Sequence, residues 1–468
     1  MGESRSEQVE TLLRRHGPMP ARHIGEALGV SQPTVSRALA TAGERVVRIG
    51  RARATRYALA RDIGRAGTRW PLYRIGPDAL AVQLGEIRAL AGDGFHFEPS
   101  GAMSAFLHGE FSDGLFPGLP WFLDDQRPQG FLGRMFVQRV ASRLGAPDDL
   151  LRWGADDIVL GLLHHGHDQP GDLVLGDAAL QAALQLGLSH DDVLLPEDRQ
   201  ARYPQLAEAA LRGELAGCSA GGEQPKFLAN VHGDEGVRSL IVKFSERTTT
   251  PAGRRWGDLL QCEHIAATVL CEHRLPAAGS QILEASGRVF LESTRFDRTP
   301  LRGRRGFVSL AALDAAFHGH GRIDWWRYAQ QLQDDGWLRP DDAHRLRVIG
   351  WFGALTGNTD MHLGNAALTL SDTRPLALAP AYDMLPMLFR PAGNGEVVER
   401  TFTVVPPVPG QHAEWSQAAH AAVRFWALVA DCMGVSGPFR GLAARCGDAV
   451  ARALARYGQE QAHPAAAR

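Results

Sequence analysis

Apolar residues recur at helical spacing in three short segments at the start of the chain. The segments are SEQVETLLRRHG, ARHIGEALG and VSQPTVSRALATAG, which cover residues 6–17, 21–29 and 30–43. In the third segment, Ser31 stands where an N-cap is expected, and Pro33 falls in the first turn, where proline is tolerated. The pattern therefore predicts three short helices.

A two-stranded hairpin is predicted directly after these helices. VVRIGRARATRYAL, residues 46–59, alternates apolar and basic positions around Gly50, as two strands joined by a turn do. Only Gly29 and Val30 separate the second and third helices, a tight turn like that of a helix-turn-helix. The three helices and the hairpin resemble a winged helix-turn-helix, which we expect over residues 1–68.

Charge is distributed unevenly along the chain. Residues 1–69 hold 13 Arg against 6 Asp and Glu, a balance of +7, whereas the whole chain has a net charge of −2. A basic head on an acidic body favours DNA binding by the head alone. The alternative is a protein-interaction module with a solvated basic face. The residues that we expect to contact DNA lie at the start of the third helix and on the hairpin: Gln32, Thr34, Ser36, Arg37, Arg51, Arg53 and Arg56.

The remaining residues predict a mixed α and β body. Residues 71–90 are strand-rich, and a mainly helical pattern follows from residue 130 to the end of a subdomain that we expect over 69–215. Three histidines crowd the segment His164–Asp168. Neighbouring rings in a loop flanked by Gly and Pro seldom converge on one metal ion, so we expect an ordinary surface loop there.

Composition places the chain among globular proteins. It has 468 residues, of which 44% are hydrophobic, enough for several cores. No run of 18 apolar residues and no signal-peptide pattern occurs, so we expect a cytoplasmic protein without membrane association. The five cysteines are odd in number and lack CxxC spacing, which argues against a disulfide framework or a structural zinc site.

Lysine is confined to two positions of the whole chain, Lys226 and Lys243, although Lys and Arg together number 50. Guanidinium is a wide planar fork, whereas ammonium is a compact charge that fits beside phosphate oxygens in a narrow slot. A chain that otherwise uses arginine should keep lysine where the fork does not fit. Chance placement of two rare residues is the alternative.

The surroundings of these lysines predict a nucleotide site. The small residues of 219–222 allow backbone N–H groups to approach an anion, and KFLANV and VRSLIVKF alternate like two strands that end at Lys243. This order suits nucleotide phosphates gripped by Lys243. Glu263, on the helix predicted next, is equally compatible with a pair to Lys243 and with an exposed carboxylate.

GNTDMHLGN carries the spacing of a kinase catalytic loop. Asp360 and Asn365 match D-x-x-x-x-N, in which the carboxylate takes a hydroxyl proton and the amide oxygen binds magnesium. Two short strands about SDTRP would return the chain so that Asp383 lies beside Asn365, and these two side chains can hold Mg²⁺. Taken singly, a capping aspartate, a turn asparagine and an N-cap explain the three residues as well.

Five motifs in series, SAGGEQPKF, IVKFS, TRFDR, GNTDMHLGN and APAYDMLP, resemble those of the HipA-type serine/threonine kinases, the toxins of bacterial toxin–antitoxin modules. With the winged head in front, the chain looks like the YjjJ branch of that family. The resemblance implies an α+β, two-lobed protein-kinase-like fold. Residues 216–300 would be the nucleotide-binding part of the N-lobe, and residues 301–468 the α-rich C-lobe.

The resemblance also implies roles for individual residues. Asp360 would be the catalytic base, Asn365 and Asp383 the Mg²⁺ ligands, and Ser219 the site of autophosphorylation that silences the kinase. Thr294 stands where many members have an acidic residue, which leaves only a backbone contact to adenine there. The implied ATP contacts are Gly221, Gly222, Glu223, Gln224, Pro225, Lys226, Lys243, Thr294, Arg295, Phe296, His362, Leu363, Gly364, Asn365, Tyr382 and Asp383.

Three functions fit these observations. The first is an ATP- and Mg²⁺-dependent serine/threonine protein kinase fused to a DNA-binding head, with a translation factor or aminoacyl-tRNA synthetase as a conceivable substrate and an antitoxin as a conceivable partner. The second is a DNA-binding regulator whose kinase-like body senses nucleotide without phosphorylating a protein. The third is a DNA-cleaving toxin with metal at Asp360 and Asp383, against which the acidic body argues.

Overall fold

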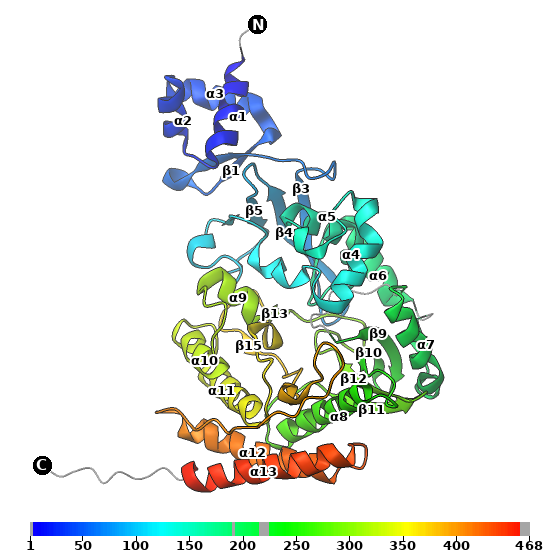
Figure 1. Ribbon diagram of the computed structural model, residues 1–468. Coiled ribbons are helices and arrows are strands. Elements are labelled where there is room, and N and C mark those ends of the chain that lie inside the picture. Colours follow the sequence, from blue (N-terminus) through cyan, green and yellow to red (C-terminus); the bar gives the residue numbers. More distant parts are fainter. Residues whose placement is uncertain (1–2, 190–191, 215–223, 459–468) are drawn as a thin grey trace, which may run out of the picture.

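The computed structural model describes residues 3–189, 192–214 and 224–458. The N-terminal helices lie at one end of an elongated molecule and the C-terminal helices at the other, with two five-stranded sheets and one three-stranded sheet between them (Figure 1). No helix in the described part of the chain is both long enough and apolar enough to cross a bilayer.

The head contains the three predicted helices and the predicted hairpin. A capping box starts the first helix, because the Ser4 side chain accepts the Glu7 N–H and the Glu7 carboxylate accepts the Ser4 N–H. Val9, Ile24 and Val35 meet in a small core that joins the helices. The elements are α1 (Arg5–His16), α2 (Ala21–Leu28), α3 (Gln32–Ala42), β1 (Val46–Ile49) and β2 (Arg56–Leu59), the last two antiparallel.

One side of the hairpin is buried against the body. Val47, Ile49 and Ala58 form a cluster with Leu90 of the next sheet. An ion pair between Arg56 and Asp113 reinforces this contact. Arg56, one of the residues expected to contact DNA, therefore has a half-exposed guanidinium that already pairs with a carboxylate of the body.

The middle layer is a five-stranded sheet in the order β6-β5-β4-β3-β7. Much of it is covered on both faces, because Phe95, His96 and Phe97 are consecutive buried residues of one strand and Leu173–Leu175 are all buried in another. Helices α4, α5 and α6 accompany it (Figure 1). The bounds are β3 (Arg69–Ile75), β4 (Ala81–Ala89), β5 (Phe95–Pro99), β6 (Leu115–Phe116), α4 (Gly130–Leu144), α5 (Ala155–His165), β7 (Leu173–Leu175) and α6 (Asp177–Leu188).

A second five-stranded sheet follows, in the order β11-β12-β10-β9-β8. Strand β8 pairs in parallel with β9, and Tyr203 and Ala207 of α7 pack on this sheet. Packing thus joins β8 and α7 to the second sheet, although the sequence pattern groups them with residues 69–215. The bounds are β8 (Val193–Leu194), α7 (Arg199–Leu211), β9 (Lys226–Gly233), β10 (Gly236–Phe244), α8 (Pro251–Glu272), β11 (Ser280–Ala285) and β12 (Arg288–Thr294).

The last layer is rich in helices, as expected. Its small sheet has the order β13-β14-β15, and the β14–β15 pair is the predicted hairpin about SDTRP. Trp325 and Tyr328 are buried, so the aromatic cluster after Asp324 belongs to the core. The bounds are β13 (Val308–Ser309), α9 (Leu310–Phe317), α10 (Trp325–Asp334), α11 (Pro340–Leu355), β14 (Ala367–Thr369), β15 (Ala377–Leu378), α12 (His412–Asp431) and α13 (Gly437–Tyr457).

The segment His164–Asp168 is not an ordinary surface loop. It ends α5 and continues as one 3-10 turn. Asp168 forms ion pairs with Arg295 (3.0 Å) and Arg298 (2.8 Å), which lie in the exit from β12. Burial alone would raise the pKa of Asp168, but the two guanidinium groups outweigh it and lower the pKa to about 2. The segment therefore ties the middle layer to the second sheet.

Candidate active site

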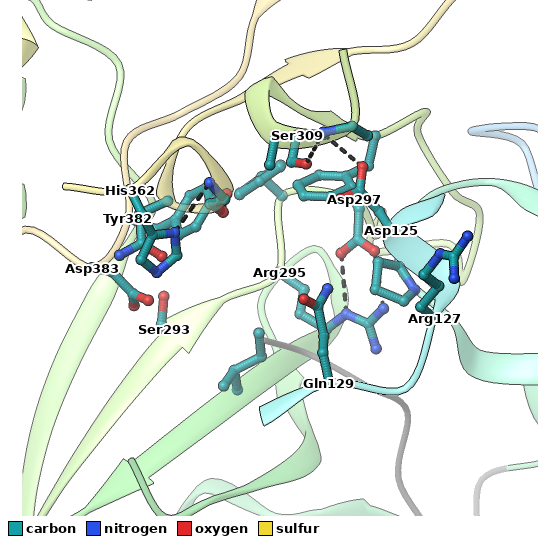
Figure 2. A pocket seen from close by; sticks show the side chains of 18 of the residues that line it. Asp125, Arg127, Gln129, Ser293, Arg295, Asp297, Ser309, His362, Tyr382 and Asp383 are labelled. Atoms are coloured by element: carbon teal, nitrogen blue, oxygen red, sulfur yellow. Dashed lines mark hydrogen bonds and ion pairs between the residues drawn. The ribbon is translucent and has the colours of Figure 1, made fainter. Parts of the chain in front are cut away.

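A cavity of about 500 Å³ lies where the second sheet, the helix-rich layer and the middle layer meet. Figure 2 shows His362, Tyr382 and Asp383 on one side of it and Asp125 and Arg127 on the other. Residues from many separate parts of the chain, between Asp124 and Asp383, converge here. Of the predicted nucleotide contacts, the cavity is lined by Lys226, Lys243, Thr294, Arg295, Phe296, His362, Gly364, Asn365, Tyr382 and Asp383.

The Lys243 ammonium lies between two carboxylates. Its Nζ is 2.6 Å from Oε1 of Glu263, and it also pairs with Oδ1 of Asp383. Burial alone would lower the pKa of Lys243, but the charges of Asp383 and Glu263 outweigh it and raise the pKa. The pair between Lys243 and Glu263 is thus formed, and Glu263 is not an exposed helix carboxylate.

The two lysines occupy facing positions of the sheet. Lys226 on β9 is the register partner of Lys243 on β10, and both side chains are buried, with exposed fractions of 2% and 5%. Burial raises the pKa of Glu263 although Lys243 opposes the shift. Burial would also raise the pKa of Asp383, but Lys243 and Lys226 reverse this and lower it. Asp383 is therefore ionised beside two cations.

The backbone at Asp383 has a positive φ of 55°, a conformation that non-glycine residues seldom adopt and that aspartate tolerates better than most. Two hydrogen bonds hold the segment. Nδ2 of Asn358 donates to the Asp383 carbonyl over 3.2 Å, and the Tyr382 hydroxyl donates to the Gly364 carbonyl over 2.8 Å. Unusual backbone that persists under such restraint is concentrated at functional sites.

The loop that carries Asp360 is held on both sides by amides. Oδ1 of Asn358 accepts the Asp360 N–H over 3.0 Å, and Nδ2 of Asn365 donates to the Asp360 carbonyl over 2.8 Å. Because its Nδ2 is used in this way, Asn365 keeps its side-chain oxygen for another ligand. His362 adds a cap, since its Nδ1 accepts the Gly364 N–H over 3.1 Å.

Asp360 itself lines a second, neighbouring cavity of about 710 Å³. His362 lines both cavities, so they adjoin at the catalytic-loop segment. The second cavity is bordered by Gly321–Arg327 and by the loop from Asn358 to Leu363. Leu363 is buried and lines this second cavity, not the first.

The segment after β12 supplies backbone and aromatic groups. The N–H of Thr294 donates to Gly279 and that of Arg295 donates to Ser239, so these two donors are occupied within the protein. An adenine edge would have to meet other groups of the segment. Phe296 lies with its ring 5.7 Å from that of Tyr382, at 31°, and gives this part of the cavity an apolar wall.

The Arg295 guanidinium takes part in a buried charge network. It binds Asp297 through two nitrogens, over 3.0 and 2.9 Å, and reaches Asp168 as well. Its side chain thereby fixes the segment that borders the cavity. Arg295 lines the cavity, as a predicted nucleotide contact should, and its guanidinium also holds the surrounding segment in place.

Several predicted residues lie elsewhere. Gln224 and Pro225 precede β9 and do not line the cavity, and the Pro225 carbonyl accepts the Phe244 N–H. In the head, Gln32, Ser36, Arg37 and Arg51 are exposed and Thr34 is half-buried. Ser219, Gly221, Gly222 and Glu223 and the side chain of Arg53 lie outside what the structure describes.

The sequence did not predict that a loop of the middle layer forms part of the wall of the first cavity. Asp124, Asp125, Arg127 and Gln129 all line the first cavity. The run DDQRPQ carries no motif, and its polar residues and proline are those of any loop. Only the folding of two distant segments onto each other gives it a place at the site.

Comparisons with known proteins agree with this architecture. Residues 66–184 match the family model "YjjJ-like toxin, middle domain", and residues 218–452 match "HipA-like C-terminal domain". Toxin YjjJ of Escherichia coli K12 is 36% identical over 440 residues, which cover 94% of this chain and 96% of that protein.

Two solved structures are more distant. One is the Shewanella oneidensis toxin–antitoxin complex of HipA, HipB and operator DNA, with 15% identity, 82% of this chain and 97% of that chain covered, and a TM-score of 0.48. The other is the Helicobacter pylori proinflammatory kinase CtkA, with 12% identity, coverage of 50% and 92%, and a TM-score of 0.34. The family models and the Escherichia coli relative establish that the chain belongs to the YjjJ-like toxins of the HipA-like kinase family.

Proposed function

We propose that this protein is an ATP- and Mg²⁺-dependent serine/threonine protein kinase with a DNA-binding head. The observation that carries the proposal is the cluster in the first cavity. Lys243 is paired with Glu263 and Asp383, and Asn365 lines the same space. A buried ammonium beside an ionised carboxylate and an amide matches the parts that bind phosphates and metal in phosphoryl transfer.

Asp360 is the base in this proposal. Its carboxylate takes the proton of a serine or threonine hydroxyl while that oxygen forms a bond to the γ-phosphorus and the bond from the γ-phosphorus to the β–γ bridging oxygen breaks. The two amides that hold the Asp360 backbone fix the position of the carboxylate. The protein substrate enters through the second cavity, which Asp360 lines.

The residues present fit Mg²⁺. No described residue donates a hydrogen bond to the side-chain oxygen of Asn365, and the pKa of Asp383 is lowered, so both offer the hard oxygen ligands that this ion prefers. When bound, Mg²⁺ neutralises charge on the triphosphate. Lys243 and Lys226 add positive charge from the sheet on the same side as Asp383.

Transfer of label from γ-labelled ATP tests the enzyme. We expect wild type to label serine or threonine of a protein substrate, which mass spectrometry identifies, with translation factors and aminoacyl-tRNA synthetases as the first proteins to examine, and Ser219 of its own chain. Asp360→Ala should lower the rate at least about 100-fold, the usual share of a general base. Asp341→Ala, an exposed carboxylate at the start of α11 that lines neither cavity, is the matched control.

Equal labelling by wild type and Asp360→Ala would exclude Asp360 as the base. No transfer by wild type, combined with an effect of ATP on DNA affinity, would instead support a regulator that only senses nucleotide. That second function gains support from the head, whose hairpin packs directly on the body and so provides a contact through which nucleotide and DNA sites can influence each other.

DNA binding by the head rests on α3 and the hairpin. Gln32, Ser36 and Arg37 are exposed at the start of α3, where a recognition helix meets base edges, and Arg51 is exposed between the strands. Selection from a random duplex library at fixed salt tests this. Enrichment of a sequence that full-length Ser36→Ala and Arg37→Ala fail to retain supports the proposal, and uniform retention contradicts it. An antitoxin partner would be sought by purification of the complex from cells.

A further inference from the structure

One wall of the first cavity comes from the middle layer and carries a carboxylate, Asp125, that the proposed phosphoryl transfer does not use. Asp125 lies in the turn Trp121–Gln126, and one of its oxygens accepts the backbone N–H of Ser309 over 2.6 Å. Ser309 is the N-cap of α9 in the helix-rich layer. Asp125 therefore joins two layers at the edge of the cavity.

Nearby cations are committed to other carboxylates. Arg127 pairs with Asp124, and Arg295 pairs with Asp168 and Asp297. Among the described residues, Asp125 forms no ion pair. A carboxyl group in this position keeps acceptor capacity, since its two oxygens offer about four lone-pair sites and the backbone and side chain of Ser309 use at most two of them.

The electrostatic environment of Asp125 also fits a buried carboxyl group without a paired cation. Burial raises the pKa of Asp125 to about 6, against which its hydrogen bonds with Ser309 act only in part. Asp125 lines the same cavity as Lys243 and Asp383, so its carboxyl group faces the space in which the nucleotide is expected. Unpaired, desolvated carboxyl groups in cavities are concentrated at functional sites.

Such a group needs a hydrogen-bond donor. A triphosphate offers acceptors and negative charge, and its expected place is beside Lys243 and Asp383, across the cavity from Asp125 (Figure 2). The nucleoside half of ATP offers the donors, which are the exocyclic amine of the base and the hydroxyls of the ribose. Resting on the proposed function, we propose that Asp125 accepts a hydrogen bond from the nucleoside of the bound nucleotide and so determines which nucleotide binds.

The simpler role, a carboxylate that only caps Ser309, makes a different prediction. An amide oxygen serves one backbone N–H as well as a carboxylate oxygen does, so Asp125→Asn would then leave nucleotide discrimination unchanged. A carboxylate that also accepts from the nucleoside makes a stronger, charge-assisted bond that the amide cannot match. The two roles are separable by binding measurements on one conservative variant.

The experiment compares the affinities of ATP, inosine triphosphate, 2′-deoxy-ATP and 3′-deoxy-ATP for the full chain with Mg²⁺ present. Inosine triphosphate lacks the amine, and each deoxy compound lacks one hydroxyl. We expect wild type to bind one of these analogues about 10- to 100-fold more weakly than ATP, the range for a hydrogen bond to a charged group. The analogue that loses affinity identifies the donor.

Variants complete the test. Asp125→Asn should reduce the discrimination several-fold and Asp125→Ala should abolish it, while Asp124→Asn, a neighbouring carboxylate that pairs with Arg127, should preserve it. Discrimination that persists unchanged in Asp125→Asn and Asp125→Ala overturns the inference while leaving the kinase proposal intact. Failure of wild type to bind any of the four nucleotides overturns both.

Discussion

The cavity and the head use basic side chains in opposite ways. In the cavity, Lys243 is buried and its charge is met by Glu263 and Asp383 within the same chain. On the head, Arg37 and Arg51 are exposed on α3 and beside the hairpin. The difference shows that the role of a basic side chain depends on whether the negative charge that balances it lies within the same chain or on a separate binding partner.

Arg56 is intermediate between the buried, paired lysine and the exposed arginines. It belongs to the same basic hairpin as Arg51, yet its guanidinium is half-exposed and pairs with Asp113 of the body. Removing one partner of a buried pair costs about 3 to 5 kcal/mol, whereas an exposed pair contributes about 1 kcal/mol or less. The cavity and the head should therefore respond very differently to substitution and to salt.

The largest expected effect comes from Asp383→Ala. The substitution removes the proposed metal ligand and a partner of Lys243, so phosphate transfer from ATP should fall about 1000-fold, the scale on which preorganised charge acts in catalysis. DNA affinity of the head should stay within twofold. Parallel transfer and DNA-binding assays check this, and an equal loss in both would show that the two regions are not separate.

Lys243→Arg sharpens the comparison because it keeps the charge and changes only its shape. The wider fork has to enter a slot built for an ammonium, so we expect transfer to fall about 10- to 100-fold and stability to fall by about 1 to 3 kcal/mol, as for an overpacked core. Arg238→Lys, the reverse exchange at a half-exposed site of the same strand, is the control. Full activity in Lys243→Arg would mean that the confinement of lysine to this strand pair has no functional reason.

Substitutions of arginines on the head should change how strongly DNA affinity depends on salt concentration. Arg37→Ala and Arg51→Ala should each weaken DNA binding several-fold and reduce the slope of log affinity against log salt by about 1, while phosphate transfer is unchanged. Arg56→Ala should change that slope less, since its charge already has a partner in the body. Fluorescence anisotropy over a salt series measures all three, and identical slopes for the three variants would contradict the distinction.

The smallest effect concerns pH and Asp125. Its pKa of about 6 exceeds the ordinary value near 4, so the folded protein holds this proton longer than the unfolded chain does. Stability is therefore lost as pH rises from about 4 to about 6 and stays reduced above. Asp125→Asn should raise the melting temperature by a few degrees at pH 7.5 and by less at pH 5, whereas Asp124→Asn should show no such trend.

Local patterns in the sequence carried much of this site. The alternation around the lysines, the D-x-x-x-x-N spacing and the SDTRP turn predict β9, β10 and the β14–β15 hairpin, and the structure brings Lys243, Asn365 and Asp383 to one cavity. Each of these depends on residues near one another in the chain or on a motif whose chemistry is specific.

What escaped prediction depends on contacts between distant segments. Asp125 meets Ser309 across 184 positions, and Asp168 meets Arg295 across 127. Neither aspartate has neighbours in sequence that distinguish it from a loop residue. The ion pair of Arg56 escaped prediction for the same reason, because nothing near Arg56 in the sequence reveals that Asp113 lies opposite.

The apolar seam between the hairpin and the body, formed by Val47, Ile49, Ala58 and Leu90, has one more consequence. Because the hairpin packs against the body, the head is held by this contact as well as by its linker and does not move independently of the body. If α3 binds a duplex as proposed, the opening of the first cavity has a fixed orientation relative to the DNA axis. Only protein substrates that approach the DNA-bound protein from the side of this opening would then reach the cavity.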